Sequence, residues 1–129
     1  MADLTTAIAG TIHRYVEAFS NDDRATWLGC FTADATMEDP VGSPPKRGHD
    51  EIGTFYDQSR SSADAIQASI SGAPIVCGAE ASFTFDIVVT VGGSKMGMSV
   101  IDVMTFDDDA RITSQRAFVD FSQLAPLDS

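Results

Sequence analysis

The sequence is poor in positively charged side chains. Its 129 residues include 8 Lys and Arg against 19 Asp and Glu, which gives a formal charge of −11 at pH 7. Nucleic acids and anionic membranes are bound by dense positive surfaces, so this balance argues against both as partners. A neutral small molecule or a cationic partner remains compatible with the charge.

Cysteine and long apolar runs are also scarce. The two cysteines, Cys30 and Cys77, stand in no metal-binding or redox spacing and are expected to be free, buried thiols. No apolar run approaches the ~18 residues of a membrane span, and residues 1–6 lack the basic and apolar segments of a secretory signal. These absences predict a soluble, cytoplasmic protein.

Several motifs of well-known chemistry are missing. The chain has no phosphate-binding loop, no dinucleotide fingerprint and no Gly-x-Ser-x-Gly nucleophile. Its two histidines, His13 and His49, lie in separate predicted helices without ligand-like neighbours, so no metal site is expected. The acidic run 107–109 lacks the spacing and the glycine of a calcium loop, and a solvated turn is expected there.

The first half of the chain has the periodicity of helices. Apolar residues recur at every third or fourth position over the first twenty residues, with Asp3 as the N-cap and a stop at 20–22. The predicted inward face of this helix consists of Leu4, Ile8, Ile12, Tyr15 and Phe19. Two further helices are expected, over 23–31 and 49–60. The inward side chains predicted for them are Trp27, Leu28 and Phe31, then Ile52, Phe55 and Tyr56.

The second half alternates with the period of strands. Strands are predicted over 34–39, 65–70, 74–77, 83–91, 96–106 and 111–121, with turns at 92–94 and 107–110. Helices followed by an antiparallel meander predict an α+β fold in a single domain over residues 1–129. We expect a curved, mixed or antiparallel sheet, wrapped by three N-terminal helices into a cone around an apolar pocket.

Asp102 is the most informative residue of the sheet. Its strand parity groups it with Val100 and Met104, so a carboxyl group points where the pattern favours an aliphatic side chain. Burial of a charged carboxylate is unfavourable, and such a group is expected to keep its proton and act as a hydrogen-bond donor. The alternative is a partly hydrated face on which Asp102 forms a salt bridge.

Two other residues complete a candidate site. Asp39 lies at the end of a predicted strand, before Pro40, and Tyr15 lies on the apolar face of the first helix. Taken singly, Asp39 can be no more than a turn-forming residue before Pro40, and Tyr15 can be an ordinary core tyrosine. Together with Asp102 they would suit proton transfer at a carbon next to a carbonyl, with a carboxylate as base and two donors on the enolate oxygen.

Three sequence segments resemble a known family. They are Ala33–Pro40 (ADATMEDP), Gly48–Tyr56 (GHDEIGTFY) and Val100–Met104 (VIDVM). With Tyr15, they are similar to bacterial Δ5-3-ketosteroid isomerase of the nuclear-transport-factor-2-like superfamily. The resemblance runs from about residue 14 to 124. It implies a single ketosteroid-isomerase-like domain.

The resemblance implies a reaction and roles. Asp39 would carry a proton from carbon 4 to carbon 6 of a 3-oxo-Δ5 steroid, giving the conjugated 3-oxo-Δ4 product. Tyr15 and Asp102, the latter kept neutral, would donate hydrogen bonds to the oxygen of the dienolate. Tyr56 would hydrogen-bond to Tyr15. The family also implies a homodimer that uses no cofactor.

The sequence differs from one branch of this family at two positions. One branch has a further tyrosine where this chain has Phe31, and a tryptophan where it has Val119, so one pocket wall is expected to be wider. These changes affect the preferred steroid more than the reaction. Substrate contacts are expected from Phe55, Phe83, Phe85, Val100 and Val119, and each could equally be plain core.

Other functions on the same fold remain open. A polyketide cyclase could also use a pocket aspartate. Epoxide hydrolase relatives need an Asp-Arg-Asp set, and Arg116 has the opposite parity from Ala117 and Val119, which weighs against that chemistry. A non-catalytic binder of steroid-like ligands is the third possibility. Substitution of Asp39 separates a binder, which keeps its affinity, from an isomerase, which loses turnover.

Overall fold

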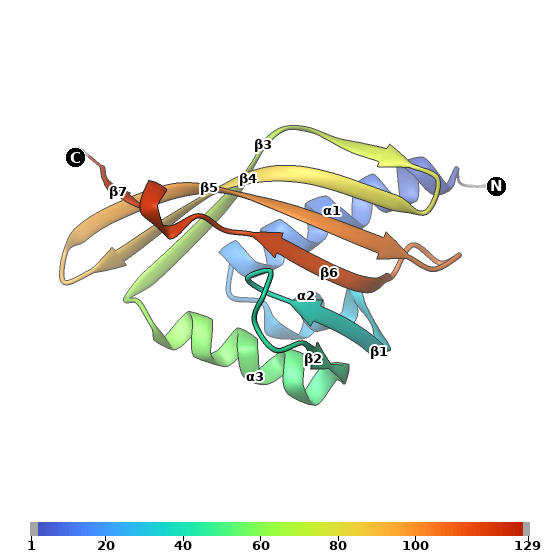
Figure 1. Ribbon diagram of the computed structural model, residues 1–129, viewed down its shortest axis with the longest axis horizontal. Coiled ribbons are helices and arrows are strands. Elements are labelled where there is room, and N and C mark those ends of the chain that lie inside the picture. The colour runs from blue at the N-terminus through green and yellow to red at the C-terminus, as the bar shows by residue number, and fades with distance from the viewer. Residues whose placement is uncertain (1–2, 128–129) are drawn as a thin grey trace.

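The computed structural model describes residues 3–127, which form three α-helices and one curved sheet (Figure 1). The helices are α1 (Leu4–Ser20), α2 (Arg24–Gly29) and α3 (Gly48–Ser61). The strands are β1 (Phe31–Glu38), β2 (Lys46–Arg47), β3 (Ala65–Cys77), β4 (Glu80–Val91), β5 (Ser94–Phe106), β6 (Ile112–Phe118) and β7 (Ala125–Pro126). A short 3-10 helix, η1, spans Phe121–Gln123. The α+β class predicted from the sequence is confirmed.

The sheet is mixed and is built around one parallel pair. Its strand order is β2-β1-β6-β5-β4-β3, and β7 pairs with β5. Only β1 and β6 run parallel, while the other pairs are antiparallel. Figure 1 shows β3 to β6 as a long curved ribbon, with α1 crossing it and with α3, β1 and β2 below. The inside of this curve holds the core and the cavity described below.

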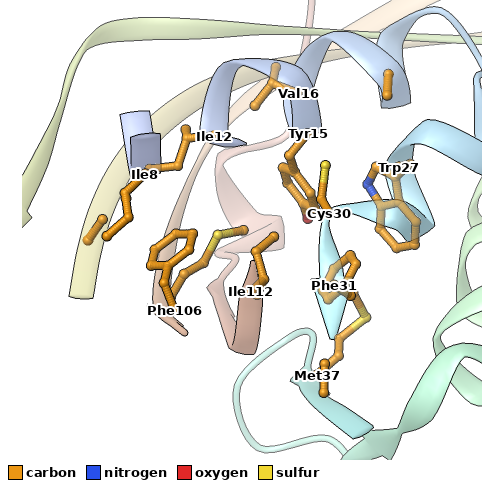
Figure 2. Packing of buried hydrophobic residues seen from close by; sticks show 14 of the residues in the cluster. Ile8, Ile12, Tyr15, Val16, Trp27, Cys30, Phe31, Met37, Phe106 and Ile112 are labelled. Carbon is orange, nitrogen blue, oxygen red and sulfur yellow. The ribbon is translucent and has the colours of Figure 1, made fainter. Parts of the chain in front are cut away.

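The first helix follows the apolar pattern of its sequence. The Asp3 carboxylate caps α1 by accepting from the Thr5 N–H (3.4 Å), and the helix ends at Ser20 as expected. Ile8, Ile12 and Tyr15 are all buried. This face packs on the inner side of the sheet, which places Tyr15 deep in the molecule (Figure 2).

The second helix is shorter than predicted, and Phe31 does not belong to it. α2 ends at Gly29, and Phe31 begins β1. Tertiary pairing is the reason, because Phe31 lies opposite Ile112 of β6, and the Ile112 N–H donates to the Cys30 carbonyl (2.7 Å). Strand pairing with a distant segment therefore overrides the helical spacing of Trp27, Leu28 and Phe31.

Two strand predictions were also wrong in their bounds. The short strands predicted at 65–70 and 74–77 form one strand, β3, whose register with β4 shifts between Ser71 and Ile75. The last strand ends at Phe118 rather than at residue 121. The chain leaves the sheet there because the Asp120 carboxylate accepts from the Ser122 N–H (3.1 Å) and caps η1.

Aromatic rings form the centre of the core. Trp27 lies 5.0 Å from the Phe31 ring, 5.0 Å from Tyr56 and 5.6 Å from Tyr15, measured between ring centroids. Figure 2 shows Tyr15 reaching down from α1 beside Trp27 and Phe31. Burial of such rings removes large apolar areas from water, which stabilises the fold. The cluster ties α2 and α3 to α1 and to β1. Cys30 is buried in this core, but Cys77 at the end of β3 is exposed, so the prediction of a buried thiol was wrong for Cys77.

Candidate active site

A cavity of about 310 Å³ opens between the helices and the inner face of the sheet. Its wall is mostly aliphatic and aromatic, as is typical of pockets for small apolar ligands. The polar side chains on the wall are Tyr15, Trp27, Asp39, Ser59 and Ser62. A mostly apolar wall with one carboxyl group fits an uncharged ligand that carries few polar atoms.

Four of the five side chains predicted to contact substrate line this cavity. Phe55 comes from α3, Phe85 from β4 and Val100 from β5, while Val119 follows the end of β6. Phe83 does not line it: its side chain lies in the core behind the wall, 6.3 Å from the Tyr15 ring and 5.8 Å from the Phe85 ring. Phe83 therefore packs behind Tyr15 and is not part of the cavity wall.

Tyr15 of α1 lines the cavity. The ring is stacked on Trp27 and is almost fully buried. Burial raises the pKa of the phenol well above its usual value, and the carboxyl groups of Asp102 and Asp39 raise it further when they are ionised. The hydroxyl therefore keeps its proton at neutral pH and is available as a donor.

Asp39 is the carboxyl group on the cavity wall. It follows β1 directly, and Pro40 after it also lines the cavity. Burial raises the pKa of Asp39, whereas a hydrogen bond from Gln115 and the positive charge of Lys46 lower it. The net result is a raised pKa, so the carboxylate of Asp39 binds a proton more readily than an exposed aspartate does.

Asp102 lies behind the wall and is completely buried. It is paired with Phe83 on β4 and Ala117 on β6, so its parity toward the core is as predicted. Burial raises the pKa of Asp102 well above its usual value, and the nearby charge of Asp39 adds to this. A neutral acid results, and its Oδ1 has no hydrogen-bond partner among residues 3–127.

The sequence reasoning missed Gln115, which connects the two carboxyl groups. Its Nε2 lies 3.2 Å from Asp39 Oδ2 and 3.3 Å from Asp102 Oδ2. The signal was present, because Gln115 shares the strand parity of Ala117, whose side chain is buried. A buried amide on an otherwise apolar face is as unusual as the buried carboxyl that identified Asp102.

Tyr56 does not make the contact that the resemblance implies. Its hydroxyl donates to Asp22 Oδ1 (2.7 Å) and not to Tyr15. Asp22 lies just after α1 with a left-handed backbone (φ 55°), and this turn directs its carboxylate toward α3. Tyr56 therefore joins the end of α1 to α3, and it affects Tyr15 only through the aromatic cluster around Trp27.

Three buried polar atoms lack hydrogen bonds within the described part of the chain. They are Trp27 Nε1, Asp102 Oδ1 and Gln115 Oε1. Each such atom costs about 1–3 kcal/mol of stability when it is buried without a partner. Trp27 lines the cavity, and Gln115 joins Asp102 to Asp39 on the cavity wall. This concentration of unsatisfied groups marks this region as a place for function rather than stability.

The structure bears on the other chemistries considered above. Residues 3–127 contain no group of three or more His, Cys, Asp or Glu side chains able to hold a metal ion. Arg116 points away from the cavity, where its Nε meets Glu38 Oε1 at 2.9 Å and its guanidinium covers Phe118. No arginine lines the cavity in the described range, so the Asp-Arg-Asp set is not assembled. Within that range, no helix has the length and apolarity that a bilayer crossing needs.

Comparisons with known proteins agree with this geometry. Residues 12–115 match the model of the SnoaL-like domain. The chain is 32% identical over 115 residues to a steroid delta-isomerase of Nocardioides simplex, covering 89% of this chain and 91% of the relative. Its fold matches SalBIII, described as an epoxide hydrolase/cyclase-like enzyme in pyran ring formation in polyether salinomycin. That match has a TM-score of 0.85 at 19% identity and covers 95% of this chain and 98% of the other.

Proposed function

The chain belongs to the SnoaL-like domain family, and on this basis we propose that it is a steroid Δ-isomerase. The reaction converts a 3-oxo-Δ5 steroid to the conjugated 3-oxo-Δ4 isomer. One observation carries the proposal: the Asp39 carboxyl group on the wall of an apolar cavity lies near the phenol of Tyr15 and the carboxyl group of Asp102, and both of these buried groups keep their protons. The similarity to the Nocardioides simplex enzyme supports the choice of a steroid as substrate.

The first step removes a proton from the substrate. Asp39 takes the proton from carbon 4, and the electron pair of the C–H bond forms the dienolate, whose negative charge gathers on the 3-oxygen. Tyr15 and Asp102 donate hydrogen bonds to that oxygen and so stabilise the charge as it develops. Asp102 is not on the wall itself, so the ketone must displace neighbouring side chains to reach it.

The second step returns the same proton. Neutral Asp39 protonates carbon 6, the dienolate electrons move the double bond into conjugation, and the carboxylate is regenerated. One base serves both steps because the two carbons are close together on one face of the steroid. Proton transfer of this kind accelerates a reaction by about 10²–10⁴-fold, and each oxyanion donor contributes about 10²–10³-fold.

Ultraviolet absorbance of the conjugated enone tests the proposal. Wild-type protein mixed with a 3-oxo-Δ5 steroid is expected to show fast turnover. Asp39→Asn is expected to reduce turnover by at least about a hundredfold, because the amide cannot accept the proton. Its affinity for a phenolic steroid should be unchanged or higher. Asp34→Asn, an exposed position on the same strand, is the matched control and should keep full activity.

A polyketide cyclase-like activity is the second candidate. It is favoured by the fold shared with SalBIII, whose name describes cyclase-like chemistry. If the wild-type protein binds a phenolic steroid but does not isomerise the 3-oxo-Δ5 substrate, the isomerase proposal fails. A cyclase or a non-catalytic binder then becomes the better description of the same cavity.

We also propose that the protein is a homodimer. Apolar side chains lie on the outer face of the sheet, where Ile101 and Phe118 are paired across β5 and β6 and are each 45% exposed. Burial of this patch against a second copy would remove it from water. Analytical ultracentrifugation is expected to give twice the chain mass, and Phe118→Lys is expected to shift the protein toward the monomer.

A further inference from the structure

The side chain of Gln115 lies between the carboxyl groups of Asp39 and Asp102, and the packing of the fold does not require a glutamine there. Its side chain is buried on the inner face of β6, at a position where an aliphatic residue would complete the core. It contacts Asp39 at the end of β1 and Asp102 on β5, the strands on either side of β6 in the sheet. One amide therefore contacts both Asp39, the proposed base, and Asp102, a proposed donor to the oxyanion.

Electrostatics fixes the orientation of the amide. An amide has two N–H donors on nitrogen and an acceptor on oxygen, and here the nitrogen lies near one oxygen of each carboxyl group. The reverse orientation would bring Oε1 against the carboxylate oxygen of Asp39, which is repulsive. Both N–H groups are thus engaged, one with each acid, and Oε1 is left without a partner among residues 3–127.

The amide contacts the same atom, Oδ2, in both acids. The proton of neutral Asp102 is therefore expected on Oδ1, because Oδ2 already accepts from Gln115. Oδ1 of Asp102 is also the atom that has no partner in the described protein. In Asp39, the contact with Oδ2 leaves Oδ1 to take a proton from the substrate. Each acid then presents one defined atom for its proposed task.

We propose that Gln115 is a positioning residue that couples the base to the buried acid: it holds Oδ2 of both Asp39 and Asp102 and leaves Oδ1 of each for the substrate. This inference rests on the proposed isomerase function. It adds that the proposed base, Asp39, and the buried acid, Asp102, both accept a hydrogen bond from the same amide. When Asp39 accepts a proton, its hold on Gln115 weakens, and the amide is freer to hold Asp102 while the dienolate charge is greatest.

Several groups other than Gln115 also act on Asp39. Lys46 of β2 lowers the pKa of Asp39, and burial raises it. Asp102 of β5 and Tyr15 of α1 face it from the other elements, and both are neutral in the reactive form. Gln115 donates to the ionised form of Asp39, so its removal is expected to raise the pKa of Asp39.

Gln115→Met is the first variant, because methionine matches the length of glutamine and has no N–H donor. Turnover is expected to fall about ten- to a hundredfold through misplacement of both acids, with little change in KM. The acid limb of the pH profile of kcat/KM is expected to move to higher pH. The melting temperature is expected to change little, because the removal of the unsatisfied Oε1 is offset by the loss of the hydrogen bonds to Oδ2 of Asp39 and Asp102.

Controls separate positioning from structural support. Gln67→Met, at an exposed position of β3, is expected to change neither activity nor the pH profile. Gln115→Glu keeps the shape of the side chain but loses the amide donors, so it should also move the acid limb upward. A Gln115→Met variant with kcat within twofold of wild type and an unmoved acid limb overturns the inference.

Carbon-13 NMR titration of the aspartate carboxyl groups tests the coupling without any steroid. In Gln115→Met, the Asp39 resonance is expected to titrate at higher pH than in wild type, whether or not the protein isomerises steroids. An unchanged Asp39 titration overturns the coupling even if the enzyme is active. Absence of steroid turnover by wild-type protein counts against the proposed function alone, so the two failures are distinguishable.

Discussion

A single buried carboxyl group has opposite effects on stability and on the proposed activity. Asp102 is fully buried, and one of its oxygens lacks a partner among the described residues. Asp102→Leu removes this unfavourable group from the core and is expected to leave the protein folded and at least as stable. The same change should lower turnover by about 10²–10³-fold through loss of a donor to the oxyanion. Calorimetry and the enone assay measure the two effects.

The protonation of Asp102 makes stability depend on pH. Its pKa in the fold lies well above the 3.8 of an ordinary aspartate, so above about pH 4 the unfolded chain loses a proton that the folded protein keeps. The free energy of unfolding therefore decreases as the pH rises through this window, by at most about 1.4 kcal/mol per pH unit for one carboxyl. Asp39, whose pKa is also raised, contributes in the same direction.

Asp102→Leu is expected to reduce this pH dependence. Urea unfolding from pH 4 to pH 8 should show that the stability advantage of the variant over wild type grows with pH. Asp86→Leu on β4, where the aspartate is exposed, is the matched control and should show no such growth. An advantage that is constant with pH would mean that Asp102 is ionised in the fold.

For single residues, the alternation of side chains along a strand was the strongest sequence signal of burial. It correctly predicted that Asp102 faces the core, because every second residue of a strand faces the same side. It would also have identified Gln115, had polar residues other than acids been considered. The contact between Tyr56 and Asp22 was not predictable from sequence. It depends on the angle at which α3 meets the end of α1, which short-range patterns do not encode.

Among the elements, α3 is joined to both α1 and β3 by Arg60. Nη1 of Arg60 donates to the carbonyls of Phe19 (2.8 Å) and Ile66 (3.2 Å), and its guanidinium lies over the Phe19 ring. Because Phe19 and Ile66 both line the cavity, this contact joins the cavity wall on α1 to the wall on β3. It is shielded from water, since the Arg60 side chain is 19% exposed.

Arg60→Met is expected to lower the free energy of unfolding by about 2 kcal/mol, because hydrogen bonds from a charged donor are lost from a partly buried site. Affinity for a phenolic steroid should also fall as the wall loosens. Arg24→Met, which breaks an exposed ion pair with Asp57, is the comparison and should cost less than about 1 kcal/mol. Chemical denaturation measures both variants. Equal effects would show that Arg60 acts only as a surface charge.

Element types were more predictable than their ends. The apolar period of four and three residues located α1 correctly, and the Gly92-Gly93 turn located the β4–β5 hairpin. Phe31 was placed in a helix because its spacing from Trp27 is helical, yet pairing with β6 draws it into β1. Such pairings join segments far apart in the chain, and local periodicity carries no information about them.

For the whole molecule, the formal charge of −11 affects which ligands approach quickly. A neutral steroid has no long-range interaction with this charge, so its kcat/KM is expected to change by less than about twofold between 0.02 and 0.5 M NaCl. A sulfated steroid should be repelled at low salt and react faster as salt is added. Initial rates over this range measure both. A strong salt effect on the neutral steroid would indicate a charged step in binding.

The overall architecture followed from sequence more completely than the cavity did. Helices before an antiparallel meander predicted the α+β class and the apolar interior. Which side chains reach the cavity depends on the curvature of the sheet and on neighbouring rings. Phe83 and Phe85 have the same parity, yet only Phe85 lines the cavity, because Tyr15 covers Phe83.

The parallel pair of β1 and β6 also has a consequence for folding. It joins Phe31 to Ile112, and the hydrogen bonds from Gln115 join the end of β1 to β5 and β6. A ribosome-bound chain synthesised only as far as about residue 109 cannot form this pair, because it contains α1 to β5 but not β6. Closing so long a loop is slow relative to hairpin formation. We therefore expect the β3–β4–β5 meander to form early and the active site to assemble last.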